Sequence, residues 1–265
     1  TGVWEPIKYT GTYGTNGFYL SLSDTSSIGK DFSGNGNNWT PNNISTANDS
    51  TFDLMRDVPT QYTPQGATDV GGVVRGNYAT LNPLVGVTNT TFSNGNLTFT
   101  KTGISDIVLP STIAMPSGKF YWETTLTSVS AGSNIGLGLI QQDAPAAGTG
   151  TWPGADNPAI VLFGGNGNLY VNGTSSSGTG LSLATNDVVG LALDMSAATL
   201  AIYKNGSLVY TATSLVVTKP YLALFDSYGN GESQTVNFGQ RPFAYTPPSG
   251  FKSLCTTNLP TPTIG

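Results

Sequence analysis

The chain has 265 residues, of which 34 are glycine and 16 are proline, and only 9% are charged, against about 25% in an average globular domain. Its net charge is −5 and its ten lysine and arginine residues are scattered singly, which excludes the basic patch of a nucleic-acid-binding protein. The absence of histidine removes the usual base of a catalytic triad and the commonest zinc ligand. No apolar run approaches the roughly 20 residues of a membrane-spanning helix, so no membrane insertion is expected.

Many turn formers and few helix formers predict an all-β protein with almost no helix. The first eighty residues are predicted to precede the main domain or to pack on it. Within them, residues 17–22 alternate and predict a strand with Phe18, Leu20 and Leu22 on one face. Residues 41–80 hold few apolar side chains, which indicates an irregular connection that is functional or packed over the main domain.

The loop at residues 31–40 imitates the first half of a calcium-binding loop. Asp31, Ser33, Asn35 and Asn37 have the ligand spacing, with Gly36 at the sharp turn. The bidentate glutamate that would close the site is missing, because position 42 is asparagine. Asn-Gly pairs more commonly form tight turns, since both residues tolerate positive φ. We therefore expect no cofactor, with calcium as the alternative.

Residues 187–209 predict a β-hairpin, because their apolar residues alternate along two runs. The pair Asn205 and Gly206 supplies the positive-φ positions of a tight turn. The side chains expected in the core are those of Leu191, Leu193, Leu200 and Ile202.

The same hairpin resembles a signature of the SPRY domain. Two further segments match the family in the same order: 117–123 (Ser-Gly-Lys-Phe-Tyr-Trp-Glu) followed by 136–139, and 221–251. Ala198 stands where the family usually has glycine. The resemblance implies an antiparallel, concanavalin A-like β-sandwich over residues 81–254, which binds partners through loops at one end and is not an enzyme. Trp122 alternates as a strand residue and is expected to be structural.

Residues 255–265 are rich in threonine and proline and predict an extended tail. Cys255 cannot form a disulfide within the chain, because it is the only cysteine. We expect it to be a small buried group, the alternatives being an interchain bridge or a reactive thiol.

A glycoside hydrolase of the glucanase type is a weaker alternative, because such enzymes use the same scaffold and need only two carboxylates. No two acidic residues here lie two positions apart, so no strand presents paired carboxylates on one face. A cross-strand pair of Glu123 with Asp194 is the remaining arrangement, although both acids also fit the SPRY pattern.

Three loops combine an aromatic side chain with Asn, Asp or Gly, as carbohydrate sites do. They are residues 35–39, 151–157 and 226–232, and the second is the strongest candidate, although its tryptophan could instead cover the sandwich edge. The predicted ligand-binding residues are Trp152, Asp156, Asn157, Trp39, Tyr228 and Asn230.

Segments 17–24, 31–40, 74–83 and 254–262 resemble SPRY-containing virion proteins of tailed bacteriophages, found in tail fibres or capsid appendages. The resemblance implies a virion or extracellular location and an adhesin that recognises a host cell-surface glycan or protein. The alternative is a structural decoration or assembly protein that contacts other virion subunits. We expect a homo-oligomer and, because the sequence starts at Thr1, processing or a longer parent polypeptide.

Overall fold

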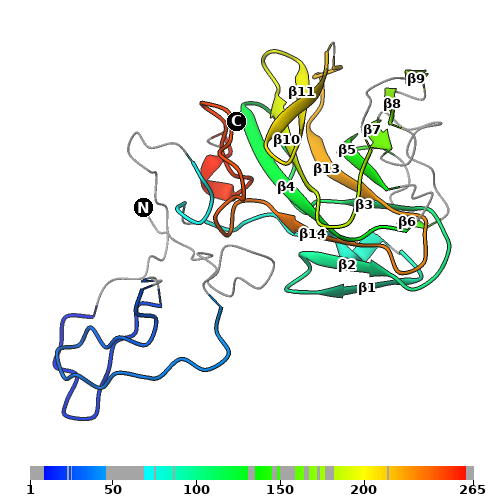
Figure 1. The fold of residues 1–265 in the computed structure, drawn as a ribbon. Helices are drawn as coiled ribbons and strands as arrows, with labels where there is room; N and C mark the ends of the chain where they lie inside the picture. The colour runs from blue at the N-terminus through cyan, green and yellow to red at the C-terminus, as the bar shows by residue number, and fades with distance from the viewer. Residues whose placement is uncertain are drawn as a thin grey trace.

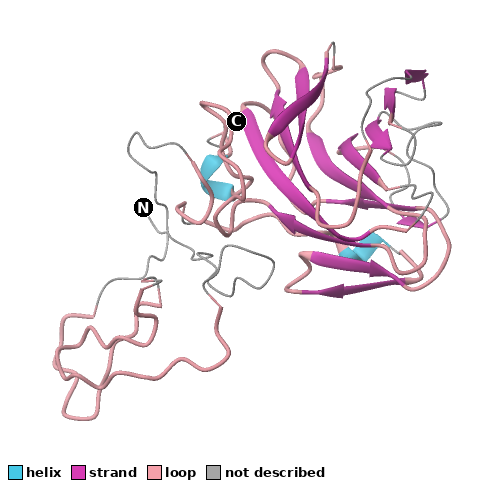
Figure 2. Cartoon of the chain, viewed as in Figure 1, coloured by secondary structure: helices cyan, strands magenta, loops and turns pink. Residues whose placement is uncertain are grey.

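The computed structural model describes residues 9–22, 24, 26–45, 69–74, 76–85, 87–130, 135–144, 148–149, 159–163, 167–171, 174–176, 182–213 and 215–260. These residues form an all-β, antiparallel sandwich, as the composition predicts (Figures 1 and 2). Helical structure in the described residues is restricted to two 3-10 turns, η1 (Pro83–Val85) and η2 (Thr256–Asn258).

The two sheets have seven strands each. The first has the order β1 (Thr90–Ser93), β2 (Thr98–Lys101), β14 (Ser233–Asn237), β4 (Lys119–Ser128), β10 (Val188–Asp194), β11 (Thr199–Lys204) and β12 (Ser207–Ala212). The second has the order β6 (Gly148–Thr149), β3 (Ile107–Pro110), β13 (Tyr221–Asp226), β5 (Gly136–Gln141), β7 (Ala159–Phe163), β8 (Asn168–Val171) and β9 (Thr174–Ser176).

The main core lies between the two sheets. Trp122 on β4 faces this core and is fully buried, with Leu191 of β10 as its register partner, which confirms its predicted structural role. The four side chains that the hairpin pattern placed in the core are fully buried as well. Period-two alternation therefore identified the inward face of the strands correctly.

The predicted hairpin is two consecutive hairpins, because β10, β11 and β12 follow one another in the sheet. The turn between β11 and β12 contains Asn205 (φ 49°) and Gly206 (φ 78°), as expected for a tight turn. The turn between β10 and β11 places Ala198 at φ 54°, in the left-handed region that glycine favours.

Replacement of Ala198 by glycine is expected to raise the free energy of unfolding by about 0.5–1 kcal/mol. A left-handed alanine costs roughly 1–2 kcal/mol, which exceeds the entropy cost of a glycine. Urea denaturation measures the change. The matched control is Ala197→Gly in the same turn, where φ is not positive and glycine should lower stability. A198G at or below the wild-type stability would contradict the strain argument.

Residues 69–74 and 76–81 include contacts with the chain that follows β14. The carboxylate of buried Asp69 accepts hydrogen bonds from the Ser253 amide (2.7 Å) and hydroxyl (2.7 Å) and from Asn258 Nδ2 (3.2 Å). Cys255 is fully buried beside Val74, in line with the small buried group that we expect. The division of the chain at residues 80 and 254 stays a prediction.

The strand predicted at residues 17–22 is not formed, and this expectation is wrong. The segment makes one isolated bridge, between Leu20 and Asp31, while Phe18 and Leu22 are exposed. Side chains, and not a neighbouring strand, donate hydrogen bonds to the backbone here. The side-chain amides of Asn35 and Asn37 donate to carbonyl groups of residues 14–17. Figure 1 shows residues 9–45 beside the sandwich, outside its two sheets.

Candidate functional site

The structure describes two of the three candidate loops. Trp152, Asp156 and Asn157 lie outside the described residues, so their predicted role stays a prediction. Trp39 lies in the N-terminal segment, whereas Tyr228 and Asn230 lie in the loop between β13 and β14. These three are exposed.

The predicted calcium ligands build a loop held by hydrogen bonds. The Asp31 carboxylate accepts from the amides of Tyr19 (2.9 Å), Ser33 (2.8 Å) and Asn37 (2.9 Å), and from the Ser33 hydroxyl (2.7 Å). Burial raises the pKa of this carboxyl group, but the four hydrogen bonds outweigh burial and lower the pKa to about 2. The loop therefore has a structural explanation that requires no calcium. Among the described residues, no group of three or more acidic or cysteine side chains is placed to hold a metal ion.

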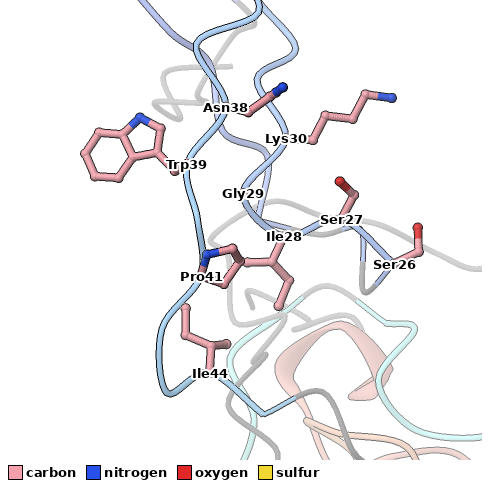
Figure 3. A pocket seen from close by; sticks show the side chains of 9 residues that line it. All are labelled: Ser26, Ser27, Ile28, Gly29, Lys30, Asn38, Trp39, Pro41 and Ile44. Atoms are coloured by element: carbon pink, nitrogen blue, oxygen red, sulfur yellow. The ribbon is translucent and has the colours of Figure 1, made fainter.

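Exposed aromatic side chains gather around this loop. The rings of Phe18 and Trp39 are in contact, with centroids 4.9 Å apart, and the Trp39 side chain is 57% exposed. A cavity of about 680 Å³ lies beside them, and Figure 3 shows Ile28, Pro41 and Ile44 close together at its apolar end. The Trp39 ring points away from Lys30 and Ser27 in this view, so the polar groups and the indole do not converge on one ligand position.

The loop at residues 226–232 is likewise held by hydrogen bonds to a buried carboxylate within it. Glu232 is fully buried and accepts from the Ser227 hydroxyl (2.5 Å), the Gly229 amide (2.8 Å) and the Ser130 hydroxyl (2.6 Å). Carboxylates that accept several such bonds hold a loop in one conformation. Tyr228 at its tip is nevertheless 40% exposed, so the loop presents an aromatic side chain on a fixed support.

A second loop with an exposed apolar side chain is hydrogen-bonded to the Tyr228 loop. The Ser105 amide donates to the Tyr228 carbonyl at 3.3 Å, which brings residues 102–106 against 226–232. Ile104 in this loop is 65% exposed. We call residues 102–106 and 226–232 together the loop edge. It combines exposed Ile104, Tyr228 and Asn230, as expected of a surface that buries apolar area against a partner.

A charged cluster lies at the base of the loop edge, where Lys101, Asp226 and Glu232 are buried and Asp106 is partly buried. The Lys101 ammonium is buried and donates to the Ser105 hydroxyl at 2.9 Å. Burial lowers the pKa of Lys101, whereas Asp226, Asp106 and Glu232 act on it as opposing negative charges. Sequence reasoning missed both Lys101 and Ile104. The burial of Lys101 could have been predicted from its position two residues after Phe99, because alternate residues of a strand share a face.

The carboxylates of the hydrolase alternative do not form a pair. Glu123 is the register partner of Gly190, whereas Asp194 is the partner of Lys119, to which it is ion-paired at 2.9 Å. Four residues of strand separate the two positions, about 13 Å, which exceeds the 5–10 Å or so that glycosidases use. Both acids have structural partners, so this geometry does not support glycoside hydrolysis.

Residues 119–241 match the family model described as "SPRY domain". This match confirms the SPRY resemblance seen in the sequence. SPRY domains are generally non-catalytic modules of protein–protein interaction, and this match is consistent with a non-enzymatic binding role.

Similar solved structures include the SPRY domain of human HERC1, with a TM-score of 0.49 and 20% identity over 56% of this chain and 92% of that chain. The TRIM65 PSpry domain has a TM-score of 0.49 and 17% identity over 61% and 93%. Stonustoxin has a TM-score of 0.48 and 17% identity over 60% of this chain and 27% of that chain. No curated protein sequence matches this chain. None of the helices among the described residues has the length and apolar character needed to span a membrane.

Proposed function

We propose that this protein binds a partner protein through its loop edge. The observation that carries the proposal is the exposure of Ile104 and Tyr228 on two loops that the Ser105–Tyr228 backbone hydrogen bond joins. Buried Glu232 bonds the Tyr228 loop internally, so little conformational freedom is lost when a partner binds. An aromatic side chain on a rigid support is the usual centre of a protein interface.

We further propose that the chain is the receptor-binding part of a bacteriophage virion and that its partner lies on the host cell surface. The support comes from the sequence segments that resemble phage virion proteins, such as residues 31–40 and 74–83. Many copies on one virion would compensate for weak binding by each copy. The exposed Phe18 and Trp39 side chains offer a second contact surface, of the aromatic kind that suits a glycan.

Replacement of Tyr228 by alanine is expected to weaken binding to intact host cells about 10- to 30-fold, since truncation of a central aromatic side chain typically removes about 2 kcal/mol. The measurement is saturation binding of the labelled protein to a panel of bacterial cells, with a glycan array in parallel. Trp39→Ala and Trp152→Ala identify the alternative surfaces.

The matched control is Tyr245→Ala. Tyr245 is 37% exposed, close to the exposure of Tyr228, but it lies beside Gly206 in the turn between β11 and β12. This variant should bind as the wild type does. Equal binding by Y228A and wild type would refute the loop edge as the contact surface. Loss of binding with W39A alone would move the site to the N-terminal segment.

The alternative, a structural virion component without a host ligand, is favoured by a different surface. Leu208 on β12, the edge strand of the first sheet, is 58% exposed, and Val216 in the following segment is 46% exposed. Apolar side chains of this kind at a sheet edge suit packing against a neighbouring subunit. Absence of binding to every cell and glycan, together with incorporation into virions, would establish this alternative.

A further inference from the structure

Asp226, the last residue of β13, is an acidic side chain in an incompletely satisfied environment. Its side chain has no solvent exposure. Oδ1 accepts one long hydrogen bond, from the Ile107 amide at 3.4 Å, and Oδ2 has no hydrogen-bond partner. A buried carboxyl group with a free oxygen destabilises the folded chain, and much more so when it carries a charge.

The charged groups that face Asp226 come from three other elements. They are Lys101 at the end of β2, Asp106 before β3 and Glu232 before β14. One ammonium group therefore opposes three carboxyl groups. Ionisation of Asp226 adds a negative charge where two others already act, and Lys101 compensates for only part of it.

The same groups are bonded to the loop that carries Tyr228. The Lys101 amide donates to the Glu232 carbonyl at 2.8 Å, and the Gly231 amide donates to the Lys101 carbonyl at 2.9 Å. Glu232 in turn accepts from Ser227 and Gly229. A change of charge at Asp226 therefore acts on a loop that is hydrogen-bonded to Lys101, Ser105 and Glu232.

We propose that Asp226 is a pH-sensitive latch for the loop edge: its neutral form holds residues 227–231 closed over the buried cluster, and its ionised form releases them. The inference deepens the proposed function, because it rests on the loop edge as the contact surface. It adds regulation: partner binding through Tyr228 is strong at acidic pH and is lost as the pH rises.

The direction follows from proton linkage. Burial raises the pKa of Asp226 well above its usual range, and repulsion from Asp106 and Glu232 adds to the rise. The closed loop therefore holds a proton that the open loop releases. Between the ordinary value near 3.8 and the raised value, each increase in pH favours the open form.

Amide hydrogen exchange at Gly229 and Gly231 tests the latch without any ligand. Protection factors, corrected for the intrinsic exchange rate, are expected to fall about tenfold or more between about pH 5 and about pH 9 in the wild type, as expected of a coupling of at least one pKa unit. Asp226→Asn cannot ionise, so its protection should not change over this range. Asp194→Asn, a buried aspartate at another turn, should retain the wild-type profile.

A second variant keeps the test independent of the folding of D226N. Lys101→Met removes the compensating charge, so the drop in protection should move to higher pH. A flat wild-type profile, or a D226N profile with the wild-type slope, would overturn the latch. If protection falls as expected but binding to host cells does not change with pH, the latch stands and the loop edge is not the contact surface.

Discussion

Replacement of Trp122 by alanine is expected to lower the free energy of unfolding by about 3–5 kcal/mol, the largest effect of any single change that we propose. Trp122 is among the largest fully buried side chains, and it lies at the centre of the core between the sheets. Its removal leaves a cavity that the neighbouring strands cannot fill, because β4 is held by pairing with β10 over residues 119–125 and with β14 over residues 123–128.

Urea denaturation followed by circular dichroism measures this effect, and Trp122→Phe is the matched control. The indole Nε1 has no hydrogen-bond partner. Phenylalanine therefore retains most of the apolar volume and removes an unsatisfied donor, so it should cost much less than alanine. A W122A variant as stable as W122F would show that the side chain does not support the core.

Replacement of Glu123 by alanine is expected to cost about 3 kcal/mol, the second-largest effect. Its carboxylate is buried on the outer face of β4 and accepts from the Ala244 amide (2.7 Å), the Tyr245 amide (3.0 Å) and the Tyr121 hydroxyl (3.0 Å). Alanine leaves the buried Tyr121 hydroxyl without an acceptor, at a cost of about 1–3 kcal/mol, and removes the acceptor of two partly buried amides, each worth about 1 kcal/mol.

The Glu123→Ala variant is expected to lose stability first in the segment that contains Ala244 and Tyr245. Hydrogen exchange at Ala244 and Tyr245 should accelerate in the Glu123→Ala variant before the rest of the sheet does, since these amides lose their acceptor. Glu123→Gln keeps one side-chain oxygen as an acceptor and should fall between the alanine variant and the wild type. Unchanged exchange at both amides would exclude Glu123 as the anchor of the chain after β14.

The regular strands of the sandwich were predictable because the burial of a strand residue follows from its neighbours in the sequence. Side chains alternate between the two faces, so the positions of Trp122 and Leu191 in the core follow from the residues on either side of them. The same reasoning failed at residues 17–22, where alternation was present but no neighbouring strand was. Asn35 and Asn37 supply the hydrogen bonds there, and side-chain bonds of this kind have no periodic pattern.

The candidate site was predictable only in part. Tyr228 and Asn230 were identified from the composition of their loop, whereas Ile104 and the charged cluster were not. A lysine considered without its neighbours is expected to be exposed. Lys101 is buried, because it shares the inward face of β2 with buried Phe99. A charged lysine side chain is usually exposed, and only its position in the strand shows that this one is buried.

Sequence alone was sufficient for the fold class, the inward face of the strands and the Asn205–Gly206 turn, because each depends on residues that are close in the chain. The loop edge depends on strand pairing instead. The hydrogen bond between Ile107 and Asp226 joins residues 119 positions apart, and it exists because β3 pairs with β13 while β2 pairs with β14. Such pairings arise from the packing of the whole sandwich, so the backbone contacts of the Tyr228 loop with Ser105 and Lys101 were visible only in the tertiary structure.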